Sequence, residues 1–252
     1  MNNKIKIPEY VNDVLFALNK NCFEAYLVGG CVRDSLLMKC PEDYDITTDA
    51  SPDEMKKCFE EFKVIETGIK HGTLTVISDE RFVEVTTFRI DGEYSDSRHP
   101  DEVLFTKNLK EDLSRRDFTI NAMAFSEKTG LVDYFGGVED LSLQTIRAVG
   151  DPQKRFEEDA LRIMRALRFS SVLGFGIEKS TSEAAFRLKD KLKNIAAERL
   201  SQELIKLIKG DNCYSVLMEY AEILGAFIPE IFPCINFEQH NKYHKYSVWE
   251  HI

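Results

Sequence analysis

Two aspartates separated by one residue, Asp43 and Asp45, are the side chains in this sequence best suited to share a metal ion. In a strand, alternation would place both carboxylates on one face and Tyr44 on the other. Two neighbouring negative charges repel each other unless a cation lies between them. Such a pair predicts a divalent cation, although many Asp-x-Asp sequences are only solvated strand edges or helix caps.

A pair of glycines, Gly29 and Gly30, precedes these aspartates and follows the apolar residues 26–28. A glycine turn between a strand and a helix leaves backbone amides free to bind phosphate. The same turn is often no more than a tight connection. A phosphate-binding turn together with metal-binding carboxylates is typical of phosphoryl or nucleotidyl transfer.

A third group of residues, Arg115, Arg116 and Asn121, follows a long polar stretch. Adjacent arginines offer planar donors that fit phosphate oxygens, and the asparagine could reach a ribose hydroxyl. The alternative is an ordinary helix start that carries an exposed arginine pair.

A fourth group runs along a predicted helix: Asp159, Arg162, Arg165 and Arg168, preceded by Glu158. A spacing of three places each next to the following one on a single helix face. Ion pairs on a solvated helix explain this pattern. A base-reading role also fits, because an aspartate accepting from an exocyclic amine and an arginine donating to a ring nitrogen would select cytosine and adenine over uracil and guanine.

The elements that must position these groups are predicted from periodicity and end signals. We expect a helix over residues 8–20, a strand over 23–28 and a helix from the glycine turn to about residue 37. Ser51, Pro52 and Glu54 predict a capped helix start. The further predictions are strands at 63–65, 72–78 and 81–88, with Glu84 opposite Val83 and Val85; a polar loop at 89–111; a short helix at 115–123; and helices at 153–172, 181–193, 197–209 and 212–224.

Composition limits the function classes. The 252 residues are 43% hydrophobic and 30% charged, which is typical of a globular protein, and no apolar run is long enough to span a membrane. Six cysteines without a Cys-x-x-Cys pair predict free thiols in the reducing cytoplasm. The net charge is −10, but residues 147–210 carry 14 Lys/Arg against 9 Asp/Glu, which could serve a polyanionic substrate.

Five motifs in order make the sequence recognisable: residues 27–34, 43–45, 71–73, 115–122 and 158–162. Together they resemble the family of class II tRNA nucleotidyltransferases (CCA-adding enzymes) and bacterial poly(A) polymerases. The resemblance implies that Asp43 and Asp45 are catalytic and hold Mg²⁺. It implies nucleotide contacts from Gly29, Gly30, Arg33, Arg116, Asp117, Asn121, Asp159, Arg162, Arg165 and Arg168.

The resemblance also implies the architecture. We expect an α+β fold: a nucleotidyltransferase head with a mixed or antiparallel sheet over residues 1–138, followed by an all-helical neck over 139–210. A helical body would begin at 211–252 and continue into an HD-like or tail domain. His240, His244 and His251 crowd the final segment, which resembles a helix in mid-run; a metal site there lacks a complete ligand set.

The implied activity is addition of CCA to the 3′ end of tRNA from CTP and ATP, with release of pyrophosphate. Residues 89–100 resemble the loop that this family uses in switching from C to A addition. A poly(A) polymerase, or an enzyme adding only CC or only A, is the nearest alternative. A non-catalytic RNA- or nucleotide-binding protein is the alternative from another class, and the intact aspartate pair disfavours it.

Overall fold

A computed structural model of the protein describes residues 5–92, 103–235, 237–239 and 246–251. The chain divides into two compact units, and the boundary falls between Leu143 and Gln144. Each unit has its own hydrophobic core, and we describe them in turn.

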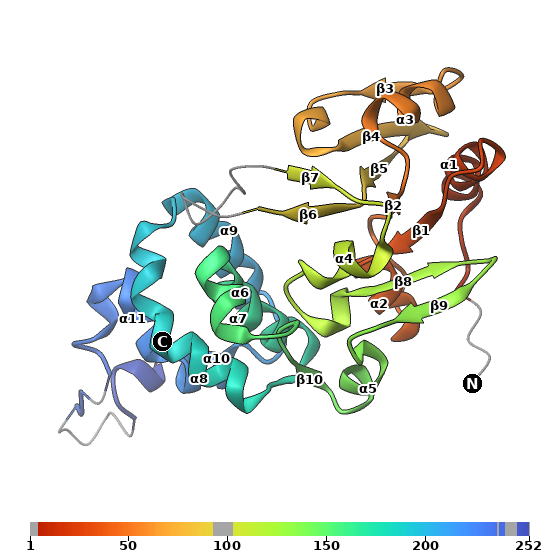
Figure 1. The fold of residues 1–252 in the computed structure, drawn as a ribbon. Helices are drawn as coiled ribbons and strands as arrows, with labels where there is room; N and C mark the ends of the chain where they lie inside the picture. Colours follow the sequence, from red (N-terminus) through yellow and green to blue (C-terminus); the bar gives the residue numbers. More distant parts are fainter. Residues whose placement is uncertain (1–4, 93–102, 236, 240–245, 252) are drawn as a thin grey trace. The chain divides into compact units, whose positions relative to one another are not determined.

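The first unit is built around one mixed sheet (Figure 1). In the described residues its seven strands lie in the order β3 (Lys63–Ile65), β4 (Thr73–Ser78), β5 (Arg81–Thr87), β2 (Asp45–Thr48), β1 (Ala25–Val28), β8 (Met123–Ser126) and β9 (Gly130–Asp133). Neighbouring strands are antiparallel except β2 and β5, which run parallel. The central position of β2 places its first residue between two neighbouring strands.

Helices cover both faces of this sheet, and β1 is buried along its whole length as a result. The helices of the unit are α1 (Glu9–Lys20), α2 (Gly30–Leu36), α3 (Pro52–Cys58), α4 (Leu109–Ser114) and α5 (Gly137–Ser142). Helix α1 packs against β1, β4 and β5. On the other face, Leu109 and Leu113 of α4 join Tyr26 and Val28 of β1 in one buried cluster. Because side chains alternate along β1, the strand contributes side chains to the hydrophobic packing on both faces of the sheet.

The predicted capped start at Ser51 is confirmed. The Ser51 hydroxyl accepts from the Glu54 amide, and the Glu54 carboxylate accepts from the Ser51 amide. This capping box begins α3 directly after β2 and fixes the direction in which the chain leaves the strand.

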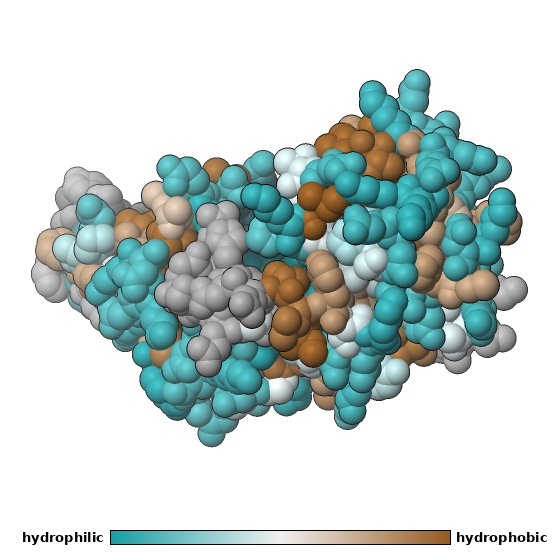
Figure 2. Space-filling view, turned by 45° about the horizontal axis from the view of Figure 1, so that its top comes forward, coloured by the Kyte–Doolittle hydropathy of each residue, from teal (hydrophilic) through white to brown (hydrophobic). Residues whose placement is uncertain are grey.

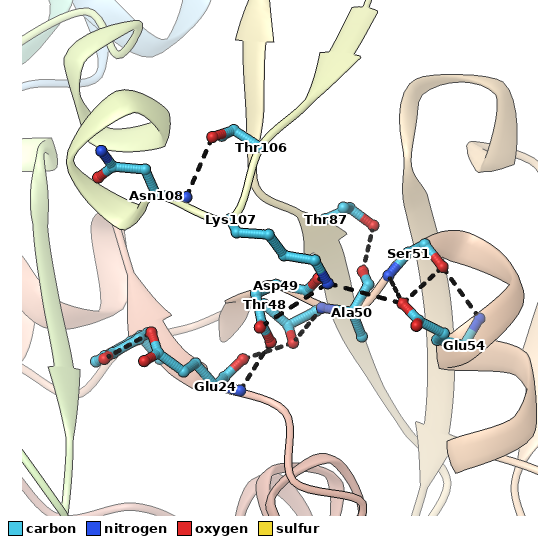
Figure 3. Close-up of polar contacts among 11 residues, drawn as sticks. Glu24, Thr48, Asp49, Ala50, Ser51, Glu54, Thr87, Thr106, Lys107 and Asn108 are labelled. Atoms are coloured by element: carbon cyan, nitrogen blue, oxygen red, sulfur yellow. Dashed lines mark hydrogen bonds and ion pairs between the residues drawn. The ribbon is translucent and has the colours of Figure 1, made fainter.

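A polar network holds the end of β2 that lies away from Asp45 (Figure 3). Asp49 Oδ1 accepts from the Glu24 amide at 2.8 Å, and the Thr48 hydroxyl donates to the Glu24 carbonyl at 2.6 Å. Lys107 donates to the Asp49 carbonyl and lies 3.9 Å from the Glu54 carboxylate. The strand is therefore tied to the chain before β1 and to the segment before α4.

The stretch expected to be a polar loop, residues 89–111, contains regular structure at both ends. Arg89–Asp91 (β6) pairs antiparallel with Val103–Phe105 (β7), and α4 begins at Leu109. The loop prediction is therefore wrong for these residues. The helix predicted at 115–123 is also wrong, because only a 3₁₀ turn, Thr119–Asn121, precedes β8.

The second unit is mainly helical. Its helices are α6 (Pro152–Glu158), α7 (Leu161–Leu173), α8 (Lys179–Leu188), α9 (Ala197–Ile208), α10 (Cys213–Glu219) and α11 (Ala221–Phe227), with 3₁₀ turns at Lys189–Asn194, Pro229–Ile231 and Trp249–His251. Two short strands, β10 (Thr145–Ile146) and β11 (Gly176–Ile177), pair in parallel. The fold class is therefore α+β, with a mixed-sheet unit followed by a helical one, as the sequence predicts.

Two helices predicted as continuous are each divided in two. The helix at 153–172 is interrupted at Asp159 and Ala160, and the one at 212–224 is interrupted at Tyr220. Ile163 and Met164 of the first, and Ile223 and Leu224 of the second, remain buried, so the apolar residues whose spacing predicted helices still pack in the core.

The surface drawn in Figure 2 is mostly hydrophilic, and its hydrophobic side chains form separate patches. Among the described residues, no helix combines the length and apolar character needed to cross a membrane. All six cysteines are free thiols.

Candidate active site

The turn after β1 brings the backbone of Gly29 close to two predicted site residues. Gly29 has a φ of +78° and a ψ of −130°, a combination that is open essentially to glycine alone. A Cβ atom on Gly29 would lie 3.2 Å from Nη1 of Arg116 and 4.0 Å from Oδ2 of Asp45. The turn followed by a helix at Gly30 is therefore present as predicted, and a side chain at its first position would crowd Arg116.

Asp45 is the first residue of β2, and the register of the sheet fixes its neighbours. Its Cα pairs with that of Val28 on β1 and with that of Glu84 on β5. Asp43 and Tyr44 precede the strand, because β1 ends at Val28 and offers no further partner. The prediction that all three residues lie in a strand is wrong in this respect, although Tyr44 is buried and Asp43 exposed.

The carboxyl of Asp45 lies in an environment that disfavours its charge. Burial raises the pKa of Asp45 to about 6, and the negative charges of Glu84 and Asp43 contribute in the same direction, while the Arg116 guanidinium opposes them. The negative charges of Asp43 and Glu84 thus both act on the Asp45 carboxyl. A cation at this position would relieve the repulsion among the three carboxylates.

A cavity of about 250 Å³ opens beside Asp45 in the first unit. It is lined by Val28, Asp45, Ile46, Thr73, Glu84, Thr86, Arg89, Arg115 and Arg116. Glu84 is exposed while Val83 and Val85 are buried, so its predicted position on the opposite face is confirmed. The lining thus combines carboxylates that could hold a cation with guanidinium groups that could hold an anion.

Arg116 has an unused donor beside this cavity. Its Nε is buried and has no hydrogen-bond partner among the described residues. A buried donor without a partner is costly. A phosphate oxygen in the cavity would satisfy it, which is the kind of ligand predicted for this arginine.

Sequence reasoning missed Asp112, which is fully buried and accepts hydrogen bonds from both Arg115 and Arg116. Burial opposes its ionisation, but the charges of the two arginines outweigh burial and lower the pKa of Asp112. The spacing of three and four residues between Asp112 and these arginines is the signal that could have identified it.

Three further predicted residues form a chain of hydrogen bonds in the first unit. Arg33 donates to both carboxylate oxygens of Asp34, from Nε at 2.8 Å and from Nη2 at 2.9 Å. Its Nη1 donates to Asn121 Oδ1 at 2.8 Å. Asn121 donates in turn to Asp117 Oδ1 at 3.2 Å. The structure thus brings Arg33, Asn121 and Asp117 together.

The carboxylates of Asp43 and Asp45 suit the binding of Mg²⁺ together with a substrate. Among the described residues, no group of three or more His, Cys, Asp or Glu side chains is arranged to hold a metal ion. Mg²⁺, however, is usually bound by one or two carboxylates together with substrate phosphates and water. Asp45, with Asp43 close enough to raise its pKa, provides this incomplete oxygen set.

In the second unit, Asp159 lies between two helices instead of within one. Its backbone is extended, with a φ of −144°, and Oδ1 accepts from the Leu161 amide at the start of α7 at 3.0 Å. Oδ2 accepts from Nη2 of Arg199 on α9 at 2.9 Å. The predicted single helix face is therefore wrong at Asp159, and the partner that holds it, Arg199, was missed because it is distant in sequence.

Arg162 lies on the first turn of α7, and Glu158 holds it. Nη1 of Arg162 donates to Glu158 Oε2 at 2.8 Å and to the Arg155 carbonyl at 3.2 Å. Further along α7, Arg168 pairs with Glu203 of α9 at 2.6 Å and stacks 3.9 Å from the centre of the Phe169 ring, and Arg165 lies 4.0 Å from Glu203. The four predicted residues thus share one region of the second unit.

Some predictions lie outside the described residues. Residues 93–100 of the loop resembling a C-to-A switch belong to this group, as do His240 and His244. His251 lies in a 3₁₀ turn with its ring 5.8 Å from that of Tyr246, so the continuous helix predicted for the end of the chain is wrong there.

Comparison with known proteins identifies two family regions in the chain. Residues 25–147 match the family described as "Poly A polymerase head domain", and residues 174–235 match that described as "Probable RNA and SrmB- binding site of polymerase A". The first match contains the cavity at Asp45, and the second contains Arg199 and Glu203.

Two similar curated proteins carry the same name. A "CCA-adding enzyme" of Enterococcus faecalis is 48% identical over 209 residues, covering 83% of this chain and 51% of the relative. One of Lactobacillus helveticus is 53% identical over 194 residues, covering 77% of this chain and 48% of the relative. The chain therefore spans about half the length of these relatives.

The chain also resembles solved structures of proteins with this name. The CCA-adding enzyme of Bacillus stearothermophilus in complex with CTP superimposes with a TM-score of 0.77 at 39% identity, covering 86% of this chain and 53% of that one. The Thermotoga maritima CCA-adding enzyme complexed with tRNA_CCA gives a TM-score of 0.73 at 28% identity, covering 91% and 54%.

Proposed function

This chain belongs to the family of class II tRNA nucleotidyltransferases and poly(A) polymerases, and on this premise we propose that it adds CCA to the 3′ end of tRNA. The reaction would transfer CMP twice from CTP and AMP once from ATP, and each transfer would release pyrophosphate. The relatives at 48% and 53% identity are named for this activity, which supports the proposal.

The cavity beside Asp45 is the observation that carries the proposal. It combines acidic side chains with Arg116, whose buried Nε has no hydrogen-bond partner in the part of the chain that the structure describes. A nucleoside triphosphate joined to a divalent cation has the complementary charges, since its phosphates would accept from the arginine and the cation would bind the carboxylates.

Asp43 and Asp45 are the residues that would hold Mg²⁺. Bound there, the metal would neutralise charge on the triphosphate and lower the pKa of the attacking 3′-hydroxyl. The raised pKa of Asp45, about 6, is caused first by burial and supports this assignment, because the site is acidic and the residues described by the structure offer it no full set of protein ligands.

The remaining first-unit residues would bind and orient the nucleotide. Gly29 lacks a side chain where a phosphate and Arg116 would approach each other, and Arg116 Nε would donate to that phosphate. We assign the hydrogen-bonded set of Arg33, Asn121 and Asp117 to the triphosphate and ribose. A preorganised set of donors lowers the cost of orienting the substrate.

Asp159 and Arg162 would select the base. Each oxygen of Asp159 already accepts one hydrogen bond, from Leu161 or Arg199, and each retains a second lone pair. Asp159 would accept from the amine of cytosine or adenine, and Arg162, held by Glu158, would donate to the ring nitrogen. Arg165 and Arg168 would support this face of α7.

The test uses a tRNA transcript lacking its CCA end, with Mg²⁺ and CTP alone, ATP alone, or both. Two added residues with CTP, and a third only when ATP is also present, are the expected result. Asp45→Asn serves as the inactive control. A long ladder from ATP alone would replace the proposal with poly(A) polymerase, which the head-domain description also fits. No extension under any condition would contradict both activities.

A further inference from the structure

Asp112 is a fully buried carboxylate that does not line the cavity at Asp45. Its Oδ1 accepts from Arg115 Nε at 3.0 Å, from Arg115 Nη2 at 2.9 Å and from the Arg89 amide at 3.3 Å. Its Oδ2 accepts from the Thr47 hydroxyl at 3.2 Å and from Arg116 Nη2 at 3.4 Å. A buried charge persists only when it is paired and hydrogen-bonded in this way.

The partners of Asp112 belong to three separate segments around the cavity. Thr47 lies two residues after Asp45 on β2, Arg89 begins β6, and the two arginines follow α4. Arg89, Arg115 and Arg116 line the cavity themselves. A single carboxylate thus connects the strand of the candidate catalytic aspartate with the arginines that face it.

The contacts with the two arginines are unequal. Arg115 makes two hydrogen bonds of normal length to Asp112, whereas Arg116 makes one long contact at 3.4 Å. Asp112 therefore binds one end of the Arg116 guanidinium, while the buried Nε keeps its donor. This arrangement orients Arg116 without consuming the donor that a phosphate would use.

We propose that Asp112 is a positioning residue for nucleotidyl transfer, which fixes the Arg116 guanidinium opposite Asp45. This proposal rests on the proposed function for the reaction itself. Without the Asp112 charge, Arg116 keeps its own charge and still attracts a triphosphate, but its direction is no longer fixed. Loss of orientation affects the transition state more than ground-state binding.

The first arm of the test measures CMP addition at varied CTP for the wild-type chain, Asp112→Asn and the matched control Asp140→Asn. Asp140 is also buried in the first unit, accepts from Thr119 and does not line the cavity. We expect kcat to fall by about 100-fold in Asp112→Asn, with little change in the KM for CTP. A rise in KM at unchanged kcat, or an equal loss in Asp140→Asn, would overturn the proposal.

The second arm does not depend on activity. In the ¹⁵N-arginine NMR spectrum, Asp112→Asn should shift and broaden the Nε–Hε signals of Arg115 and Arg116, and Asp140→Asn should leave both unchanged. Unchanged arginine signals in Asp112→Asn would overturn the proposal. An inactive wild-type chain with the expected shifts would instead reject nucleotidyl transfer while retaining the role of Asp112 in holding the arginines.

If circular dichroism shows that Asp112→Asn does not fold, a milder variant tests the same proposal. Thr47→Val preserves the shape of the side chain and removes the hydroxyl that donates to Asp112 Oδ2 at 3.2 Å and lies 3.3 Å from the Thr86 carbonyl. A smaller fall in kcat with an unchanged KM, accompanied by a shift of the Arg116 signal, is then the expected result. No effect on either readout would overturn the proposal.

Discussion

Replacing Gly29 by alanine separates the contribution of the turn to stability from its contribution to catalysis. Alanine at φ +78° and ψ −130° is strained, and residues forced into such a region cost about 1–3 kcal/mol. The new Cβ would also lie 3.2 Å from Arg116 Nη1. The end of a long side chain can yield by a few tenths of an ångström, so the steric cost falls on the position of Arg116.

Gly136→Ala is the matched control. Gly136 has the same φ, +78°, and nothing lies within 4 Å of a Cβ placed there. Its left-handed conformation should cost alanine about 1–2 kcal/mol, with no displacement of a site residue. Both variants carry a backbone penalty, which is larger at Gly29 because its ψ of −130° lies outside the left-handed region that Gly136 occupies. Only Gly29→Ala brings a side chain against Arg116.

Two assays distinguish these effects. Urea denaturation should give a free energy of unfolding lowered by about 1–3 kcal/mol for Gly29→Ala, and CMP incorporation should fall at least about 10-fold for the folded protein. Gly136→Ala should keep the specific activity of the wild type. Equal specific activities for the two variants would refute the assignment of Gly29 to the nucleotide site.

Three further results are expected. Asp45→Asn should abolish CMP incorporation yet raise the free energy of unfolding of the metal-free protein at pH 7. Burial holds the pKa of folded Asp45 at about 6, above the ordinary 3.8, so the ionised carboxylate opposes folding at that pH. A lower free energy of unfolding for the variant in urea would contradict this. Glu178 caps α8. Burial opposes its ionisation, but hydrogen bonds from Ser180 and Thr181 outweigh burial and lower the pKa of Glu178 to about 2, below the ordinary 4.5. The ionised cap therefore stabilises the fold above pH 4.5, and this stabilisation is lost as the pH falls toward 2. Glu178→Gln should lose about 1 kcal/mol at pH 7, and an unchanged acid denaturation curve would contradict the capping role. Arg162→Ala should reduce discrimination against UTP and GTP in competition assays more than it weakens CTP binding, and unaltered base selectivity would count against the base-reading role.

Local chemistry predicted the elements whose causes lie within a few residues. The capping box at Ser51 and Glu54 needs only its own turn, and the alternation around Glu84 follows from the burial of Val83 and Val85. The same reasoning located the glycine turn at Gly29 and Gly30, because strand, turn and helix are adjacent in sequence.

Predictions failed where a distant partner decides the local conformation. The segment after Arg116 has helical spacing, but it leads into β8, which pairs with β1 from an early part of the chain. Asp159 leaves the helix, accepts from the Leu161 amide at the start of α7 and pairs with Arg199, 40 residues later. Asp112 was missed for a related reason, since its partners Thr47 and Arg89 come together only when the sheet is formed.

The strand β2 carries its functional carboxylate at the first position and buried side chains behind it. A slip of one residue against β1 or β5 would turn Asp45 to the face that the buried side chain of Ile46 now occupies, so the burial of Ile46 disfavours the misaligned form. Met38, Lys39 and Cys40, in the connection that leads to the strand, are exposed and bound by no such register. The sheet register therefore does not fix the length of that connection, and once the exposed Cys22 is replaced a fluorescent label can be attached at Cys40 while the carboxylate keeps its alignment.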